Sequence, residues 1–234
     1  MTVETTQDRV PSPSQGAMVR VWSPLIRIGH WTLVTAFVVA YLTGDDVRPV
    51  HVWAGYAAAV AVLVRIVWGF VGPEQDRFAH FLRPPGDVLR YLRDAVRLRS
   101  PRSLGHSPAG GAMTVALLLS LAATTATGLV TLAQAHNAGP LAPWFGQGAG
   151  QASLLISPAR ADDDDDGRAG GVAGEAEGKG EGTESAFKDV HEVLANLTLV
   201  FALLHIGGVA LASFSHRENL VRSMVTGRKR AEPT

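Results

Sequence analysis

Four apolar stretches, each about long enough to cross a lipid bilayer, constrain this chain more than any other feature. They cover approximately residues 26–43, 50–71, 112–133 and 189–214 of the 234 residues. A helix needs about 20 mostly apolar residues to cross roughly 30 Å of hydrocarbon. A single such stretch fits a buried core helix, but four of them in a chain with few other apolar residues predict an all-α, four-helix transmembrane bundle.

The segments between these stretches differ in charge and predict an orientation. Residues 77–102 contain seven arginines, and more cations precede the first span and follow the last. Residues 135–188 contain five consecutive aspartates, Asp162–Asp166, four glutamates and only four cations. Because cytoplasmic loops carry the excess of Lys and Arg, we expect both termini and the Arg-rich loop in the cytoplasm. The acidic loop then faces the periplasm, and the protein lies in a bacterial inner membrane.

Composition divides the chain into four parts. These are a polar tail, three spans with the Arg-rich loop, an acidic glycine-rich loop, and the last span with a basic tail, over residues 1–20, 21–134, 135–188 and 189–234. We expect the first tail and the acidic loop to be disordered, because such compositions cannot bury a core. Within the Arg-rich loop, apolar residues at helical spacing between arginines predict an amphipathic cytoplasmic helix: Val88, Leu89, Leu92 and Val96.

The absence of cysteine limits the chemistry. It excludes disulfides, thiolate metal sites, iron–sulfur ligation and covalent haem attachment through a CxxCH motif. Basic and acidic residues are equal in number, 21 of each. The lipid bilayer is the expected surroundings of this chain, and no nucleic-acid partner is expected.

Four of the eight histidines lie inside the spans or at their ends: His30, His51, His191 and His205. An ionisable residue in a span indicates a functional site, although a single one is often only a packed, hydrogen-bonded side chain. With the orientation above, His30 and His205 lie near the cytoplasmic side, and His51 and His191 near the periplasmic side. His191 and His205 are fourteen residues apart, which is about 21 Å of helix and a return to nearly the same face.

Two imidazoles from different helices at each of two levels are what two bis-histidine haems require. Zinc prefers four protein ligands, and copper would favour a thioether cluster that the spans lack. A haem b takes two axial histidines and places its apolar ring against Leu, Val and Phe without a covalent link. We therefore predict two haems b, one between His30 and His205 and one between His51 and His191.

Three further residues are candidates for binding the same cofactor. Arg65 lies fourteen residues after His51, so it occupies the inner level, where it either pairs with a haem propionate or extends to the lipid headgroups. Gly44 and Gly128 lie near the outer level. Glycine there would let a porphyrin approach the backbone, but glycine is also common where membrane helices pack together.

Several motifs in order resemble the prokaryotic cytochrome b561 family, in particular its nickel–iron hydrogenase b-type cytochrome branch. They include "VRVWSPLIRIGHW", "HVWAGYAAAVAVLVRIVWGFVG", "HEVLANLTLVFALLHIGGV" and "SHRENLVRSMVTGRK", and the resemblance covers about residues 19–229. It implies a four-helix bundle with two haems b, whose ligands carry over to His30, His51, His191 and His205. The long acidic loop departs from the family pattern.

The resemblance implies a relay of electrons between a membrane quinone and a periplasmic redox partner, such as a hydrogenase or a cytochrome c. The chain would then be an electron-transfer subunit of a membrane oxidoreductase complex. Two alternatives remain open. One is a self-contained oxidoreductase that passes electrons from a small molecule, such as superoxide, to quinone. The other is a haem-free transporter that uses histidines as proton relays.

Overall fold

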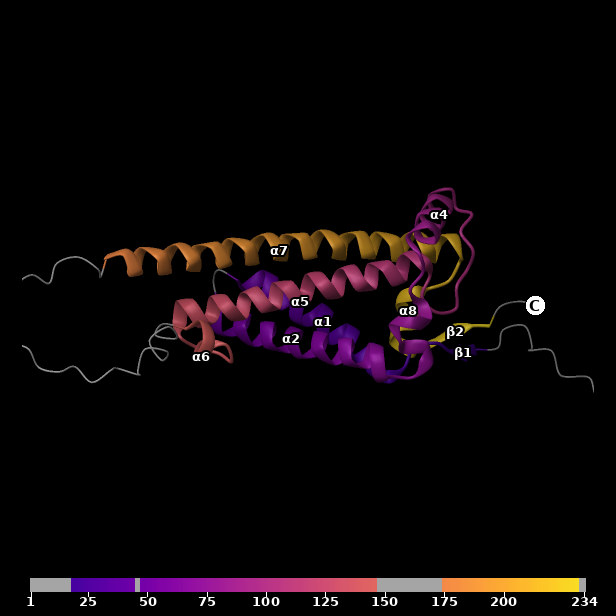
Figure 1. Ribbon diagram of the computed structural model, residues 1–234. Helices are drawn as coiled ribbons and strands as arrows, with labels where there is room; N and C mark the ends of the chain where they lie inside the picture. The colour runs from indigo at the N-terminus through magenta and orange to yellow at the C-terminus, as the bar shows by residue number, and fades with distance from the viewer. Residues whose placement is uncertain (1–17, 45–46, 147–173, 232–234) are drawn as a thin grey trace, which may run out of the picture. The chain divides into compact units, whose positions relative to one another are not determined.

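The computed structural model describes residues 18–44, 47–146 and 174–231. In this part of the chain four helices are long and apolar enough to span a membrane (Figure 1). They are α1 (Pro24–Thr43), α2 (Arg48–Val71), α5 (Pro108–His136) and α7 (Gly174–Ser215), whose apolar part is Ala186–Ser215. The predicted four-helix transmembrane bundle is confirmed.

Helices α1 and α5 begin earlier than predicted because each starts at a Ser-Pro pair. Ser23 Oγ accepts the backbone N–H of Ile26 at 3.4 Å, and Ser107 Oγ accepts that of Gly110 at 3.1 Å. Serine is a favoured N-cap residue, and the proline that follows lacks only an N–H that has no helical partner in the first turn.

Helix α7 corrects one prediction. It begins at Gly174, so residues 174–188, which we expected in a disordered loop, are helical. Ala, Glu and Lys are good helix formers, and extending a helix costs far less than starting one. The rest of the acidic stretch, including Asp162–Asp166, and residues 1–17 of the predicted N-terminal tail lie outside the described residues.

The chain divides into two compact units. Of the described residues, the first unit comprises 18–31, 67–114 and 205–231, and the second comprises 32–44, 47–66, 115–146 and 174–204. Each long helix therefore contributes one part to each unit. His30 and His205 belong to the first unit, and His51 and His191 belong to the second.

In the second unit, parts of α1, α2, α5 and α7 run alongside one another (Figure 1). Its buried positions are mostly small residues, among them Ala36, Ala54, Ala58 and Ala133, which let helices approach closely. The short helix α6 (Ala142–Phe145) follows α5 in the same unit.

Large apolar side chains face outward on all four long helices. Leu42 is 73% exposed, Leu63 62%, Leu119 66% and Val193 66%. A water-soluble protein rarely exposes so much apolar surface, and a lipid bilayer covers it at little cost. The outward faces therefore agree with the length and composition of the helices.

A two-stranded antiparallel sheet in the first unit was not predicted. Strand β1 (Met18–Arg20) pairs with β2 (Arg228–Arg230), with Met18 opposite Arg230. This corrects the expectation that residues 1–20 are disordered throughout, because 18–20 form β1. The sheet joins the segment before α1 to the segment after the helix α8 (Leu220–Thr226).

A buried ion cluster fastens the loop before α5 to the C-terminal segment of the first unit. The Arg102 guanidinium donates to both carboxylate oxygens of Glu218, at 3.3 and 3.1 Å, and the Glu218 side chain is only 8% exposed. Lys229 is also buried and donates to the Ser103 carbonyl at 3.3 Å.

The loop between α2 and α5, also in the first unit, contains three short helices. They are η1 (Glu74–Asp76), α3 (Phe78–Phe81) and α4 (Pro85–Val96). Trp68 Nε1 donates to the buried carboxylate of Asp76 at 3.0 Å and so fixes the loop to the end of α2. Helix α4 is the predicted amphipathic segment, and no residue in it is buried.

Candidate functional site

Two imidazoles from different helices face each other in the second unit. His51 lies in the first turn of α2 and His191 on α7, and their ring centroids are 6.0 Å apart with ring planes at 82°. Both side chains are partly buried. The structure thus brings together the two histidines that the sequence assigned to the outer level.

Backbone carbonyls hold both rings of this pair. His51 Nδ1 lies 2.8 Å from the Ala40 carbonyl oxygen, and His191 Nδ1 lies 2.9 Å from that of Thr124. A carbonyl oxygen can only accept, so each Nδ1 carries the hydrogen and each Nε2 keeps its lone pair. Metal-binding histidines are commonly oriented in this way by a carbonyl that accepts from the other ring nitrogen. The sequence analysis did not identify either carbonyl.

Gly128 on α5 lies directly against the His191 ring. A Cβ added at Gly128 would lie 2.9 Å from His191 Cε1 and 3.2 Å from Nδ1, closer than atoms normally approach. Gly44, in the turn after α1, lies beside His51, but a Cβ there would make an ordinary contact of 3.7 Å. Of the two predicted glycines, only Gly128 is required by its neighbours in this structure.

A pocket adjoins the His51–His191 pair within the second unit. Mostly apolar side chains from α1, α2, α5 and α7 line it, and polar groups enter at a few points. One is Tyr41, whose hydroxyl donates to Asn196 Oδ1 at 2.8 Å. A largely apolar lining with a few polar groups is typical of a site for an organic cofactor.

The first unit holds the second pair. His30 on α1 and His205 on α7 have ring centroids 6.4 Å apart and ring planes at 56°. The Trp31 ring lies nearly perpendicular to the His30 ring, with the two ring centroids 5.3 Å apart. His30 Nδ1 is buried and has no hydrogen-bond partner among the described residues.

The separations in both pairs suit a metal between the rings. Metal–imidazole bonds are about 2 Å long, so two rings on opposite sides of one metal have centroids roughly 6 Å apart. The described residues contain no cluster of three or more His, Asp or Glu that would hold a metal ion. Two imidazole donors in each pair fit a metal whose remaining ligands come from a cofactor, as iron's do in haem.

The other predicted binding residue, Arg65, is buried on α2 in the second unit. The His30–His205 pair, with which the sequence grouped Arg65 at the inner level, belongs to the first unit. Of the remaining histidines, His80 is half-exposed and lies 3.7 Å from Glu74, and His106 stacks on Phe81 with centroids 4.1 Å apart. Each of these two histidine rings therefore contacts a side chain other than a histidine.

A cluster of buried hydroxyls links α5 to α7 close to His191. Ser120 Oγ and Thr198 Oγ1 are 2.5 Å apart, and Thr124 Oγ1 lies 3.2 Å from Thr198 Oγ1. Thr198 is 1% exposed. The sequence shows hydroxyl residues on both helices at these positions, but nothing in their spacing marks them as partners.

Comparison with known proteins gives one match. The family model of prokaryotic cytochrome b561 matches residues 21–227, nearly the whole described chain. Searches of curated proteins and of solved structures found no match.

Proposed function

This chain belongs to the prokaryotic cytochrome b561 family, and on that premise we propose that it holds two bis-histidine haems b and relays electrons between a quinone and a periplasmic redox protein. Membership makes it a bacterial membrane cytochrome of the b type, which binds b-type haem and transfers electrons across the bilayer. The number of haems, their ligands and the electron partners belong to the proposal.

The observation that carries the proposal is the presence of two separate inter-helical histidine pairs. His51 and His191 would hold one haem, and His30 and His205 the other. Centroid separations of 6.0 and 6.4 Å agree with rings on opposite sides of one metal. A haem bound at either pair would supply one-electron redox chemistry.

The surrounding residues orient the ligands and shape the pocket. The Ala40 and Thr124 carbonyls fix Nδ1–H of His51 and His191, so that Nε2 is the atom offered to the metal. Gly128 leaves room for the His191 ring, and Gly44 lies at the edge of the same site. Arg65 remains our predicted partner for a haem propionate, because a buried arginine suits a carboxylate.

We also propose that both termini and the Arg-rich loop face the cytoplasm. The distribution of arginines supports this. Two contacts within the first unit add support, because they place three segments together. Strand β1 pairs with β2, which joins the residues before α1 to those after α8, and Arg102 of the loop before α5 pairs with Glu218.

Haem content and the effect of single histidine substitutions test the ligand assignment. The purified protein should show a b-type difference spectrum and two haems per chain. His51→Ala and His191→Ala should each lose one haem and leave the same redox component. His30→Ala and His205→Ala should each leave the other component. His80→Ala, a matched control outside the pairs, should keep both.

The outcomes separate the proposal from its alternatives. A spectrum without b-type haem would favour a transporter and overturn the proposal. A ratio of one haem per chain, or loss of the same component from both pairs, would overturn the pairing. Rapid reduction of the isolated protein by superoxide, without a protein partner, would favour the self-contained oxidoreductase. Co-purification with a hydrogenase would support the hydrogenase branch.

A further inference from the structure

Helix α4 presents three kinds of side chain on three different faces. At about 100° per residue, the partly buried Val88 and Ala95 occupy one face. The exposed Leu89, Leu92 and Val96 occupy the next, at 68%, 47% and 79% exposure. An apolar face this exposed, in a helix with no buried residue, lacks a partner among the described residues.

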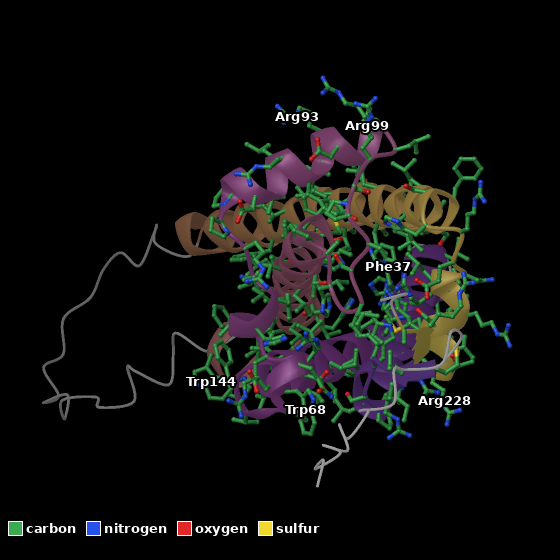
Figure 2. The ribbon with its side chains drawn as sticks, turned by 90° about the vertical axis from the view of Figure 1, so that its right-hand side faces the viewer. Phe37, Trp68, Arg93, Arg99, Trp144 and Arg228 are labelled. Carbon is green, nitrogen blue, oxygen red and sulfur yellow. The ribbon has the colours of Figure 1, made fainter. Side chains whose placement is uncertain are left out.

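Arginines adjoin this apolar face. Arg90 and Arg93 lie on the next sector of the helix, Arg97 directly follows its last residue, and Arg83 and Arg99 flank the segment. Figure 2 shows Arg93 and Arg99 extending away from the ribbon. Only two aspartates lie in the same segment, Asp87 and Asp94. Their contacts with Arg90 at 3.4 Å and Arg93 at 3.8 Å are exposed, so they hold the arginines only weakly.

We propose that α4 binds the surface of the bilayer through anionic lipid headgroups. Leu89, Leu92 and Val96 enter the acyl boundary, and the arginines contact phosphate groups. A basic, amphipathic helix of this pattern binds membranes by its apolar area together with its attraction to anionic lipid. The chain enters this segment from α2 and leaves it into α5, so the helix is tethered beside the membrane at high effective concentration.

A soluble protein partner would fit the observations less well. Interfaces between proteins have apolar centres depleted of charge, whereas here a narrow apolar strip of three side chains lies beside a row of arginines. An anionic lipid surface complements both features at once. The proposal depends only on membrane insertion and is independent of the number of haems.

Because the chain has no cysteine, single cysteines report on this helix without background. We would place Val96→Cys on the apolar face and Asp87→Cys on the acidic side as its matched control. The full-length protein is reconstituted in nanodiscs of phosphatidylcholine with or without phosphatidylglycerol. The rate of reaction with a membrane-impermeant maleimide is then measured.

We expect the cysteine at position 96 to react at least tenfold more slowly in discs with phosphatidylglycerol, and the one at position 87 to react at similar rates in both. Adding Arg90→Gln, Arg93→Gln and Arg97→Gln should remove the protection, because each basic residue near an anionic surface contributes about fivefold to binding. Equal rates at position 96 in the two disc types would overturn the proposal. So would protection that survives the triple substitution, or protection that appears only when cytosolic protein is added.

Discussion

Replacing Gly128 by alanine tests how the His51–His191 site is built. The new Cβ would lie 2.9 Å from His191 Cε1, whereas ordinary contacts begin at 3.4 Å, so the ring must retreat by at least the 0.5 Å difference. The ring is held where it is by the bond from Nδ1 to the Thr124 carbonyl, which is 2.9 Å long. Retreat by that amount along the bond would stretch it to about 3.4 Å, beyond the usual limit of about 3.2 Å.

The magnitude follows from two independent estimates. Extra carbon in a well-packed site costs about 1–3 kcal/mol. Losing the hydrogen bond that orients a metal ligand weakens metal binding by about 10–100-fold, which is about 1.4–2.7 kcal/mol. Because both costs arise from the same displacement, they are not added. We therefore expect haem at this pair to bind about 10–100-fold more weakly in Gly128→Ala.

The assay is a titration of the apoprotein with haem, followed by a redox titration of the product. The natural chain should bind two equivalents, and Gly128→Ala should bind one tightly and the second weakly. The component that weakens should be the one that His51→Ala and His191→Ala remove. Its potential and absorbance band should also change in the fraction that remains bound.

Gly207→Ala is the matched control, because a Cβ at Gly207 on α7 meets no atom within 4 Å. That variant should bind both haems as the natural chain does. If Gly128→Ala also binds both haems with unchanged affinity and spectrum, the close contact between Gly128 and His191 does not position the ligand. If it weakens the component held by His30 and His205 instead, the assignment of the pairs is wrong.

Two other substitutions have defined outcomes. Thr198→Val removes the buried contact with Ser120 and should lower the free energy of unfolding by about 0.6 kcal/mol, up to about 1.7. Thr131→Val is the control, because it loses a hydrogen bond within its own helix, and it should change the free energy of unfolding less. Glu218→Gln should destabilise the first unit by about 1.5–3 kcal/mol at neutral pH, because it removes the charge that Arg102 pairs with. Burial raises the pKa of Glu218, but the hydrogen bond and charge of Arg102 and the charge of Lys229 outweigh it and hold that pKa below its ordinary value of 4.5. The stabilisation by the Glu218 carboxylate is therefore complete above pH 4.5 and is lost as the pH falls through the pKa of the folded state. Between pH 7 and pH 3, the unfolding temperature of the natural chain should therefore fall more steeply than that of Glu218→Gln.

The sequence alone predicted the spanning helices and the partners within each histidine pair. Both predictions depend on properties that can be read from the sequence. The length of an apolar stretch gives the span, and the position of a histidine within a span gives its depth once arginines orient the helices. His51 and His191 are 140 residues apart in the chain, yet depth was enough to match them.

The contacts that hold the rings could not be predicted in the same way. The Ala40 and Thr124 carbonyls belong to the backbone, which every residue has, so no residue type marks them. The buried contact between Ser120 and Thr198 depends on how α5 and α7 are rotated about their axes, and apolar helices with weak amphipathicity do not display that rotation. Strands β1 and β2 are three residues each and lie at opposite ends of the chain, too short for a periodic pattern.

Helix α5 supplies no histidine, yet it decides where His191 lies. In a helix the carbonyl of residue 124 points toward residue 128, and a side chain there would stand between that oxygen and a neighbouring ring. Glycine at 128 uncovers the Thr124 carbonyl, and the His191 ring fills the space and donates to it at 2.9 Å. Gly128 and the Thr124 carbonyl therefore position the His191 ring together. In this way α5, which carries no histidine of either pair, determines where the His191 ring of α7 lies and which of its two nitrogens carries the hydrogen.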